Sequence, residues 1–293
     1  IKREEFIKMN TTEKKKIRLL ALDLDGTLFN EKGNITRASV EALCRIQKQG
    51  VQIVVSSGRD YDGISWEQLE EIPIDYVVTG NGSAVYATKD RKQLFEECMD
   101  QEKLIPVLEY ILQKEVYMTI FVDGAHYMPL ECESYVDNLE LPEYIKDWLR
   151  GYQKGLDNFM MHMKEDITKI QKVTLNFQSA PEGGYFNRKP VKEYLQSNPD
   201  IHVVEGGFGN LEFTRAGTNK ASGLTFLADY LHIPMEQVMA IGDSENDIEM
   251  IEAAEVGIAM GNALENVKAA AMDVTATNEE EGVAKAIQKY IEN

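Results

Sequence analysis

The stretch Leu19–Asn30 reads LLALDLDGTLFN, an aliphatic run that ends in two aspartates and a Gly-Thr pair. The nearly continuous apolar run over Ile17–Leu22 is typical of a strand covered on both faces, as in a parallel sheet. Asp23 and Asp25 then follow its carboxyl end, which is where open α/β sheets bind ligands. Two neighbouring carboxylates disfavour each other's ionisation unless a cation lies between them or one of them stays protonated.

Mg²⁺ suits such a pair, because it takes one or two carboxylates, keeps waters and completes its shell with phosphate oxygens. A calcium loop of the D-x-[DN]-x-[DN]-G type does not fit, because it needs glycine at its sixth position. That position is Leu28 when counted from Asp23 and Ile248 when counted from Asp243. A simple turn at Asp25 would leave Asp23 unexplained.

The chain around this stretch predicts an α/β fold with a doubly wound parallel sheet, because strands alternate with helices. Before residue 80, strands are expected at Val51–Val55 and Tyr76–Thr79, and helices at Thr36–Gln49 and Gly63–Glu71. After Thr218 the alternation returns. Strands are expected there at Val238–Ile241 and Val256–Ala259, and helices at Lys220–Leu231, Asp247–Ala253, Leu264–Ala271 and Glu281–Ile291.

The segment from about Tyr86 to Leu211 has a different rhythm. Its expected strands, such as VYMTIFVDG at 116–124 and KVTLNFQSA at 172–180, carry aromatic and polar residues. We expect an α+β module with an antiparallel sheet that is open to solvent on one face. The predicted organisation is a tail at residues 1–16, an α/β core of residues 17–84 and 212–293, and an inserted module of residues 85–211.

Composition narrows the class of protein. The 293 residues are 43% hydrophobic and 27% charged, as in a globular protein of one or two domains. A net charge of −18 argues against binding to nucleic acid or to anionic membranes. No run approaches the roughly 20 apolar residues of a membrane span, and the first residues lack the apolar core of a secretory signal. Cys44, Cys98 and Cys132 have no C-x-x-C spacing, so we expect reduced thiols in a cytoplasmic protein.

Further polar residues are expected at or beside strand ends. Ser57 follows the second strand, and Lys220 opens the returning helix. Asp243 and Asp247, in GDSENDIEM, are four residues apart and would share one face of a first helical turn, where N-capping is the alternative to metal binding. A lysine at a helix start opposes the helix dipole, which suggests an anion nearby. These positions are expected to converge on one site at the edge of the sheet.

In this order, the segments DLDGTL, VVSSGR, TNK and GDSEND resemble the four motifs of the haloacid dehalogenase (HAD) superfamily of phosphohydrolases. TGNGS and VGIAMGNA resemble its Cof-type branch of sugar-phosphate-like phosphatases. The long interval between Ser57 and Lys220 corresponds in that family to a type 2 cap, here of the α/β variety called 2B. Ser57 stands where threonine is commoner in Cof-type members, and it keeps the hydroxyl.

The resemblance implies a Mg²⁺-dependent phosphohydrolase that acts on a small phosphorylated metabolite, either a sugar phosphate or a phosphorylated cofactor. Asp23 would attack phosphorus and form an aspartyl-phosphate, and Asp25 would serve as acid and then base. Mg²⁺ would be held by Asp23, the Asp25 carbonyl and Asp243. Asp247 and Asn246 would orient these ligands.

The resemblance also implies phosphate and substrate contacts. The groups expected to bind phosphoryl oxygens are Lys220, Ser57 and the backbone N–H groups near Leu24 and Gly58. Arg59 and Asn81 are candidate substrate contacts, with a surface ion pair as the alternative for Arg59. The inserted module would be a lid that excludes water and sets specificity. The cap histidines His126, His162 and His202 are interpreted as ordinary surface or core residues.

The motifs leave three questions open. A sugar phosphomutase of the same superfamily would use the same aspartates, so the motifs do not separate it from a hydrolase. A non-catalytic protein that binds metabolites is a second alternative, although no catalytic position is replaced. The oligomeric state, monomer or dimer, is not indicated.

Overall fold

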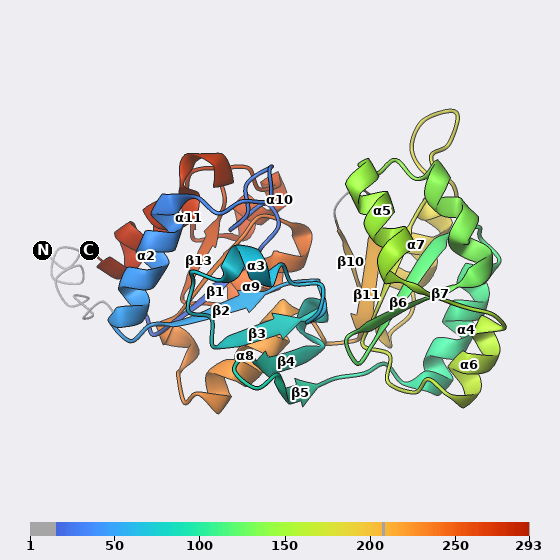
Figure 1. The fold of residues 1–293 in the computed structure, drawn as a ribbon, viewed down its shortest axis with the longest axis horizontal. Helices are drawn as coiled ribbons and strands as arrows, with labels where there is room; N and C mark the ends of the chain where they lie inside the picture. Colours follow the sequence, from blue (N-terminus) through green and yellow to red (C-terminus); the bar gives the residue numbers. More distant parts are fainter. Residues whose placement is uncertain (1–15, 207–208, 293) are drawn as a thin grey trace, which may run out of the picture.

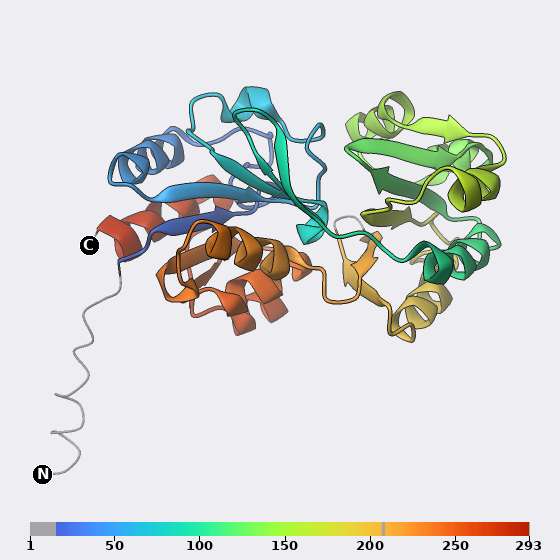
Figure 2. The same cartoon turned by 90° about the horizontal axis from the view of Figure 1, so that it is seen from below.

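The computed structural model describes residues 16–206 and 209–292, so residues 1–15 of the expected tail lie outside the described part. Within it, the strands form an eight-stranded sheet and a six-stranded sheet. Each lobe is built on its own sheet, and the lobes stand side by side in Figures 1 and 2. We call them the core lobe and the inserted lobe, because the chain enters the second from the first and then returns. No helix in the described ranges is long and apolar enough to cross a membrane.

The sheet of the core lobe confirms the predicted doubly wound α/β class. Its order is β14-β13-β12-β1-β2-β3-β4-β5, with parallel pairing from β14 to β3 and antiparallel pairing at β4 and β5. All four residues of the central β1 are buried, as its apolar run predicts. The strands are β1 (Leu19–Leu22), β2 (Gln52–Ser56), β3 (Tyr76–Thr79), β4 (Ala84–Ala87), β5 (Lys92–Glu96), β12 (Val238–Gly242), β13 (Val256–Ala259) and β14 (Asp273–Val274).

Helices cover both faces of this sheet because side chains alternate along β1. Leu20 and Leu22 pack in the cluster of α2 and α11, whereas Leu19 and Ala21 pack in the cluster of α8 and α9. The expected helix at 63–71 shrinks to α3, where Gly63 donates instead to the Asp60 side chain. The helices are α2 (Arg37–Lys48), α3 (Trp66–Leu69), α8 (Lys220–Tyr230), α9 (Ile248–Ala253), α10 (Glu265–Ala270) and α11 (Gly282–Ile287).

The sheet of the inserted lobe has the order β10-β11-β9-β6-β7-β8 and is antiparallel except between β7 and β8. Helices α4 (Gln101–Leu112), α6 (Phe159–Glu165) and α7 (Arg188–Gln196) pack on its apolar face. Its remaining elements are α5 (Glu143–Tyr152), β6 (Tyr117–Val122), β7 (Ala125–Pro129), β8 (Lys154–Leu156), β9 (Lys172–Asn176), β10 (Ile201–Glu205) and β11 (Leu211–Arg215).

The expectation that one face of this second sheet is open to solvent is wrong. Every residue of β9 is buried, including the polar ones. At one end of the face, Tyr117 packs in a cluster with Cys132 and Leu149. At the other end, Lys172 donates to the Gly58 carbonyl of the core lobe. The polar side chains of β9 are therefore covered, and those of Lys172 and Thr174 are partnered by Glu212.

Sheet membership also differs from the expected limits of the inserted module, residues 85–211. β4 and β5 extend the core sheet as far as Glu96, and β11 belongs to the smaller sheet as far as Arg215. Antiparallel edge strands of a core have the same alternating pattern as the strands of an inserted sheet. The change of rhythm near Tyr86 marks the start of antiparallel pairing and not the passage to the second lobe.

Candidate active site

The residues singled out at strand ends meet at one edge of the core sheet. Asp23 follows β1 and Asp243 follows β12, and these strands pair in parallel with Leu22 opposite Ile241. The Asp23 amide donates to the Ile241 carbonyl at 3.1 Å, which carries the pairing one residue beyond the strand. Because parallel neighbours end together, their following residues lie side by side.

A buried acidic cluster forms at this edge. Asp23, Asp243 and Asp247 each offer a carboxylate oxygen, and these oxygens lie within 4.8 Å of one another. The Lys220 ammonium, which is fully buried, donates to Asp23 Oδ1 at 2.6 Å and to Asp247 Oδ1 at 2.7 Å. Within the described residues, this cluster sets one ammonium against three carboxylates. The anion expected near the helix-start lysine is therefore a pair of aspartates.

The acidic loop is folded by its own side chains. Asp247 Oδ2 accepts from the backbone amides of Asp243 at 3.0 Å and Ser244 at 3.1 Å. Asp243 in turn accepts from the hydroxyls of Thr27 at 2.8 Å and Ser244 at 3.1 Å. Asp247 thus caps this turn with one oxygen and faces Lys220 with the other, so capping and cluster membership coexist. The motifs did not single out Thr27 or Ser244, although both stand within DLDGTL and GDSEND.

Two glycines allow the loops to approach each other. A Cβ on Gly26, whose φ is +83°, would lie 2.4 Å from Asp243 Oδ2. A Cβ on Gly82 would lie 1.9 Å from the carbonyl oxygen of Asn219, which caps the helix that begins at Lys220. The TGNGS segment therefore supports the start of α8, and glycine is required there for close backbone contact.

Burial and like charge raise the proton affinity of the cluster. Burial raises the pKa of Asp23 well above its usual value; Lys220 opposes this, and Asp247 and Asp243 add to it. The pKa of Asp243 is raised to about 6 by burial and then by Asp247, against hydrogen bonds from Thr27 and Ser244. Burial lowers the pKa of Lys220, but Asp23 and Asp247 outweigh it and raise the value overall. The single positive charge of Lys220 is therefore too little to offset burial and the mutual repulsion of the carboxylates.

The donor set of the cluster fits a hard divalent cation. Three carboxylates from two loops offer oxygen ligands, and one lysine leaves their charge uncompensated. Mg²⁺ prefers such oxygen ligands. Asp23, Asp243 and Asp247 are the residues that could hold the ion.

The Asp25 side chain lies outside this cluster, at the exposed rim. Its carboxylate receives Arg59 Nε at 2.9 Å and Arg59 Nη2 at 2.7 Å, a two-pronged ion pair. Arg59 Nη1 also donates to the Gly63 carbonyl and to Ser65 Oγ, both at 2.9 Å. Arg59 was interpreted as either a substrate contact or a member of an ion pair. The structure contains the ion pair, and the partner of Arg59 in it is Asp25, the candidate acid.

The loop after β2 carries the candidate phosphate-binding groups. Ser57 is buried, and its Oγ accepts from the Arg59 amide at 3.1 Å. The carbonyl of Gly58 accepts from Lys172 Nζ at 2.6 Å. Leu24, on the loop after β1, has a fully buried side chain.

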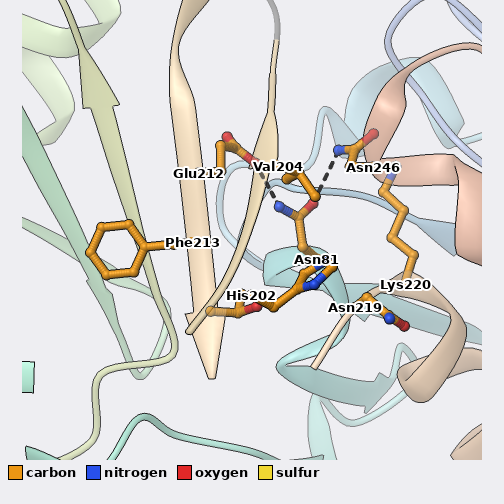
Figure 3. Close-up of a pocket in the computed structure, with 9 residues that line it drawn as sticks. Asn81, His202, Val204, Glu212, Phe213, Asn219, Lys220 and Asn246 are labelled. Atoms are coloured by element: carbon orange, nitrogen blue, oxygen red, sulfur yellow. Dashed lines mark hydrogen bonds between the residues drawn. The ribbon is translucent and has the colours of Figure 1, made fainter. Parts of the chain in front are cut away.

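Asn81 and Asn246 are brought together where the two lobes meet (Figure 3). Asn81 adopts a left-handed backbone with φ of 55°, and its amide donates to Glu212 Oε2 at 2.6 Å. Its side-chain oxygen accepts from Asn246 Nδ2 at 3.1 Å. A narrow crevice lies here, and Asn81, Glu212, Lys220 and Asn246 are among the residues that line it.

Three more residues at the site were not indicated by the motifs. Lys172 and Glu212 come from the inserted lobe, and polar residues on alternating strand positions were the signal that could have found them. Asn262 donates to the Gly26 carbonyl at 2.7 Å and stands in the quoted segment VGIAMGNA. The histidines His126, His162 and His202 each lie near a carboxylate (of Asp60, Asp166 and Glu249) that is not part of the acidic cluster.

Comparison with known proteins gives a consistent result. A family model described as haloacid dehalogenase-like hydrolase matches residues 20–287. Phosphatase YwpJ of Bacillus subtilis is 29% identical over 294 residues, covering 94% of this chain and 100% of that protein. The phosphatase YitU of the same organism, named for 5-amino-6-(5-phospho-D-ribitylamino)uracil, is 29% identical over 283 residues, covering 93% and 97%. A solved haloacid dehalogenase-like hydrolase from B. subtilis superposes with a TM-score of 0.78 at 27% identity, covering 93% and 99%.

Proposed function

This chain belongs to the haloacid dehalogenase-like hydrolases and is a phosphatase of that family, and we propose that it removes phosphate from a small metabolite with the help of Mg²⁺. The observation that carries the proposal is the buried cluster at the strand ends, in which Lys220 faces the carboxylates of Asp23, Asp243 and Asp247. A phosphoryl group bound there would lie beside the proposed nucleophile Asp23, the proposed Mg²⁺ and Lys220. Phosphoryl transfer needs mainly positioning and neutralisation of charge.

The metal would be held by the carboxylates of Asp23 and Asp243, with the Asp25 carbonyl as a third oxygen. When bound, Mg²⁺ would neutralise charge on the phosphoryl oxygens. Asp247, fixed by two backbone amides, would keep Lys220 and the acidic loop in place.

Asp23 would be the nucleophile. One of its carboxylate oxygens would form a bond to phosphorus as the bond to the leaving oxygen breaks, which gives an aspartyl-phosphate. Asp25, once protonated and released from Arg59, would give its proton to the leaving oxygen and then, as a carboxylate, take one from the water that attacks phosphorus. That attack would release inorganic phosphate and restore the Asp23 carboxylate. Arg59 would hold Asp25 at the rim between the two steps.

The phosphoryl oxygens would be bound by Lys220, Ser57 and backbone N–H groups near Leu24 and Gly58. The substrate would be small, because residues of both lobes, Asn81 and Glu212 among them, line the same narrow crevice as Lys220. A phosphorylated sugar, polyol or cofactor is the class we propose, in line with the phosphoribityl compound in the name of YitU. We place the reaction in the cytoplasm, where the three free cysteines would stay reduced.

The test is phosphate release from a panel of phosphorylated metabolites and from an aryl phosphate, with Mg²⁺ and with EDTA. We expect Mg²⁺-dependent release without any bisphosphate activator. Transfer that requires a bisphosphate activator would favour a mutase. Binding of metabolites with no hydrolysis of any ester would contradict the proposed function.

A further inference from the structure

We infer that Lys172 and Glu212 of the inserted lobe are positioning residues, which hold two core loops in the arrangement that the reaction needs. We call them the Lys172–Glu212 pair. The loops are Ser57–Arg59 after β2 and Asp243–Asp247 after β12. The inference rests on the proposed function in that these loops are taken to bind phosphate and metal.

Lys172 is a charged residue with a side chain only 2% exposed. Its ammonium donates to the Gly58 carbonyl at 2.6 Å and to Glu212 Oε1 at 2.9 Å. It also lies 4.3 Å from the centre of the Phe121 ring, within the range of a cation–π contact. A buried ammonium is costly unless it is paired and hydrogen-bonded, so these contacts fix the side chain and the loop it reaches.

Glu212 extends the connection to the acidic loop. Its second oxygen accepts from Asn81 Nδ2 at 2.6 Å, and Asn81 Oδ1 accepts from Asn246 Nδ2 at 3.1 Å, as Figure 3 shows. Asn246 lies between Asp243 and Asp247 in the chain. The backbone N–H of Asn81 also donates to the Ser57 carbonyl at 3.1 Å. Both core loops are thus linked to one ion pair of the inserted lobe.

The junction has no spare room. A Cβ built on Gly58 would lie 2.8 Å from Asn81 Oδ1 and 3.2 Å from Glu212 Oε2. Groups from three separate elements therefore meet around the Gly58 backbone. Because the junction is closely packed, a shift of the inserted lobe would break the hydrogen bonds to the Gly58 carbonyl and the Asn81 side chain.

The net charge of the Lys172–Glu212 pair distinguishes a positioning role from a role in phosphate binding. Among the described contacts, the ammonium of Lys172 is matched by the single carboxylate of Glu212, so the pair brings no net charge to the site. Its contribution is placement of the Gly58 carbonyl and the Asn81 amide. A misplacement of about 1 Å at a reacting centre can cost about 100-fold in rate, so placement alone is sufficient. The inserted lobe would then complete the site as it closes on the core.

A second contact between the lobes provides a control. His202 lies 3.3 Å from Glu249, and the Glu205 amide donates to Glu245 at 3.0 Å. Glu249 is on α9 and has no contact with Gly58 or Asn81 among the hydrogen bonds of the described residues. Glu249→Gln would therefore loosen the junction without touching the Lys172–Glu212 pair.

The experiment compares Lys172→Met and Glu212→Gln with two matched controls. Lys164→Met removes an exposed lysine that pairs with Glu109 inside the inserted lobe, and Glu249→Gln is the control just described. For each variant, kcat and KM are measured on an aryl phosphate at saturating Mg²⁺, together with Tm. Hydrogen exchange is followed at the backbone amides of residues 57–60 and 79–83.

We expect Lys172→Met and Glu212→Gln to lower kcat at least 10-fold while KM changes less than threefold. We also expect both to speed exchange in the two core segments, although the substitutions lie in the other lobe. Both controls should stay within about twofold of the original protein in kcat. Glu212→Gln keeps the shape of the side chain, so it decides the matter if Lys172→Met fails to fold.

Three results would overturn the inference. One is kcat within twofold of the original protein for Glu212→Gln, and another is unchanged exchange at residues 57–60 in that variant. The third is a loss of kcat in Glu249→Gln as large as in Glu212→Gln. If the original protein hydrolysed no phosphate ester, the proposed function would fail, while the exchange measurement would still test the positioning role.

Discussion

Two buried lysines in this molecule have opposite surroundings. Lys172, between the lobes, faces one carboxylate among the described residues, and its remaining contacts are a backbone carbonyl and an aromatic ring. Lys220, in the core, belongs to a cluster with the carboxylates of Asp23, Asp243 and Asp247. The first arrangement is electrically balanced and can be explained by structure alone. The second has a surplus of negative charge, which folding would not favour without another cation.

Charge balance, more than burial, distinguishes the candidate active site from the junction between the lobes. Ion pairs that only join two parts of a protein satisfy each charge, because an unpaired buried charge costs several kcal/mol. A surplus of carboxylates is tolerated where a ligand or metal compensates for it. The variants below change the balance at one lysine or the other.

The largest effect on activity is expected from Asp23→Asn. This substitution removes the proposed nucleophile and one of the three carboxylates in the cluster around Lys220. We expect kcat to fall by roughly 10⁴-fold or more, since removing a nucleophile removes the covalent step. The Tm of the metal-free protein should be unchanged or higher, because one of three crowded carboxylates is lost. Phosphate release and thermal unfolding measure both. Retention of a tenth of the original rate would contradict the assignment.

Lys220→Met removes the ammonium of the cluster and so increases its surplus of negative charge. We expect kcat to fall about 10³-fold, the scale seen when one charge-stabilising group is removed from a dry site. Without metal the variant should unfold at lower temperature, because buried carboxylates lose their partner. Mg²⁺ should then raise its Tm by more than it raises that of the original protein, since binding to the folded state stabilises it. Thermal melts in which Mg²⁺ raises the Tm of both proteins equally would argue against an ion shared by the carboxylates around Lys220.

Asp243→Asn reduces the surplus in a pH-dependent way. The folded pKa of Asp243 is about 6, whereas an unfolded aspartate titrates near 3.9. Its carboxylate therefore destabilises the metal-free fold increasingly as pH rises from about 4 to about 6, and fully above that. We expect the variant to be the more stable form at neutral pH, by on the order of 2 kcal/mol.

Urea unfolding of both metal-free proteins at several pH values measures this difference. The advantage of Asp243→Asn should shrink as pH falls below about 6. An advantage that is the same at about pH 4 and at about pH 7 would contradict the raised pKa.

The smallest effect is expected for the thiols of Cys98 and Cys132, whose pKa values are raised mainly by burial. Burial, followed by Glu96, raises the pKa of Cys98 to about 12. Burial also raises the pKa of Cys132 to about 12, against a hydrogen bond from the Met118 backbone. Near pH 8 we expect both thiols to react with Ellman's reagent at least about 100-fold more slowly in the folded protein than in concentrated urea. Fast labelling of Cys132 in the folded protein would contradict this.

The sequence was sufficient for the parallel strands β1, β2, β3, β12 and β13 of the core sheet and for the acidic cluster, but not for the edge strands β4, β5 and β14. An apolar run such as Leu19–Leu22 has few alternatives to a central strand, and residues after parallel strands meet at one edge. Asp23, Asp243 and Lys220 could therefore be placed together although Asp23 and Lys220 lie 197 residues apart in the chain.

What the sequence did not provide was the contact between lobes. The polar face of β9 was expected to be open, because alternation reveals that a face is polar but not what covers it. Lys172 and Glu212 find their partners, Gly58 and Asn81, only through the relative placement of two separate sheets. The Asp25–Arg59 pair depends in the same way on side-chain directions at the rim, which spacing does not determine.

The most direct test is anomalous diffraction from crystals soaked in MnCl₂, since Mn²⁺ takes the oxygen ligands that Mg²⁺ takes. We expect an anomalous peak within bonding distance of carboxylate oxygens of Asp23 and Asp243, and no peak at the Lys172–Glu212 pair. Crystals that diffract well and carry Mn²⁺ at other carboxylates but none between Asp23 and Asp243 would contradict the central claim.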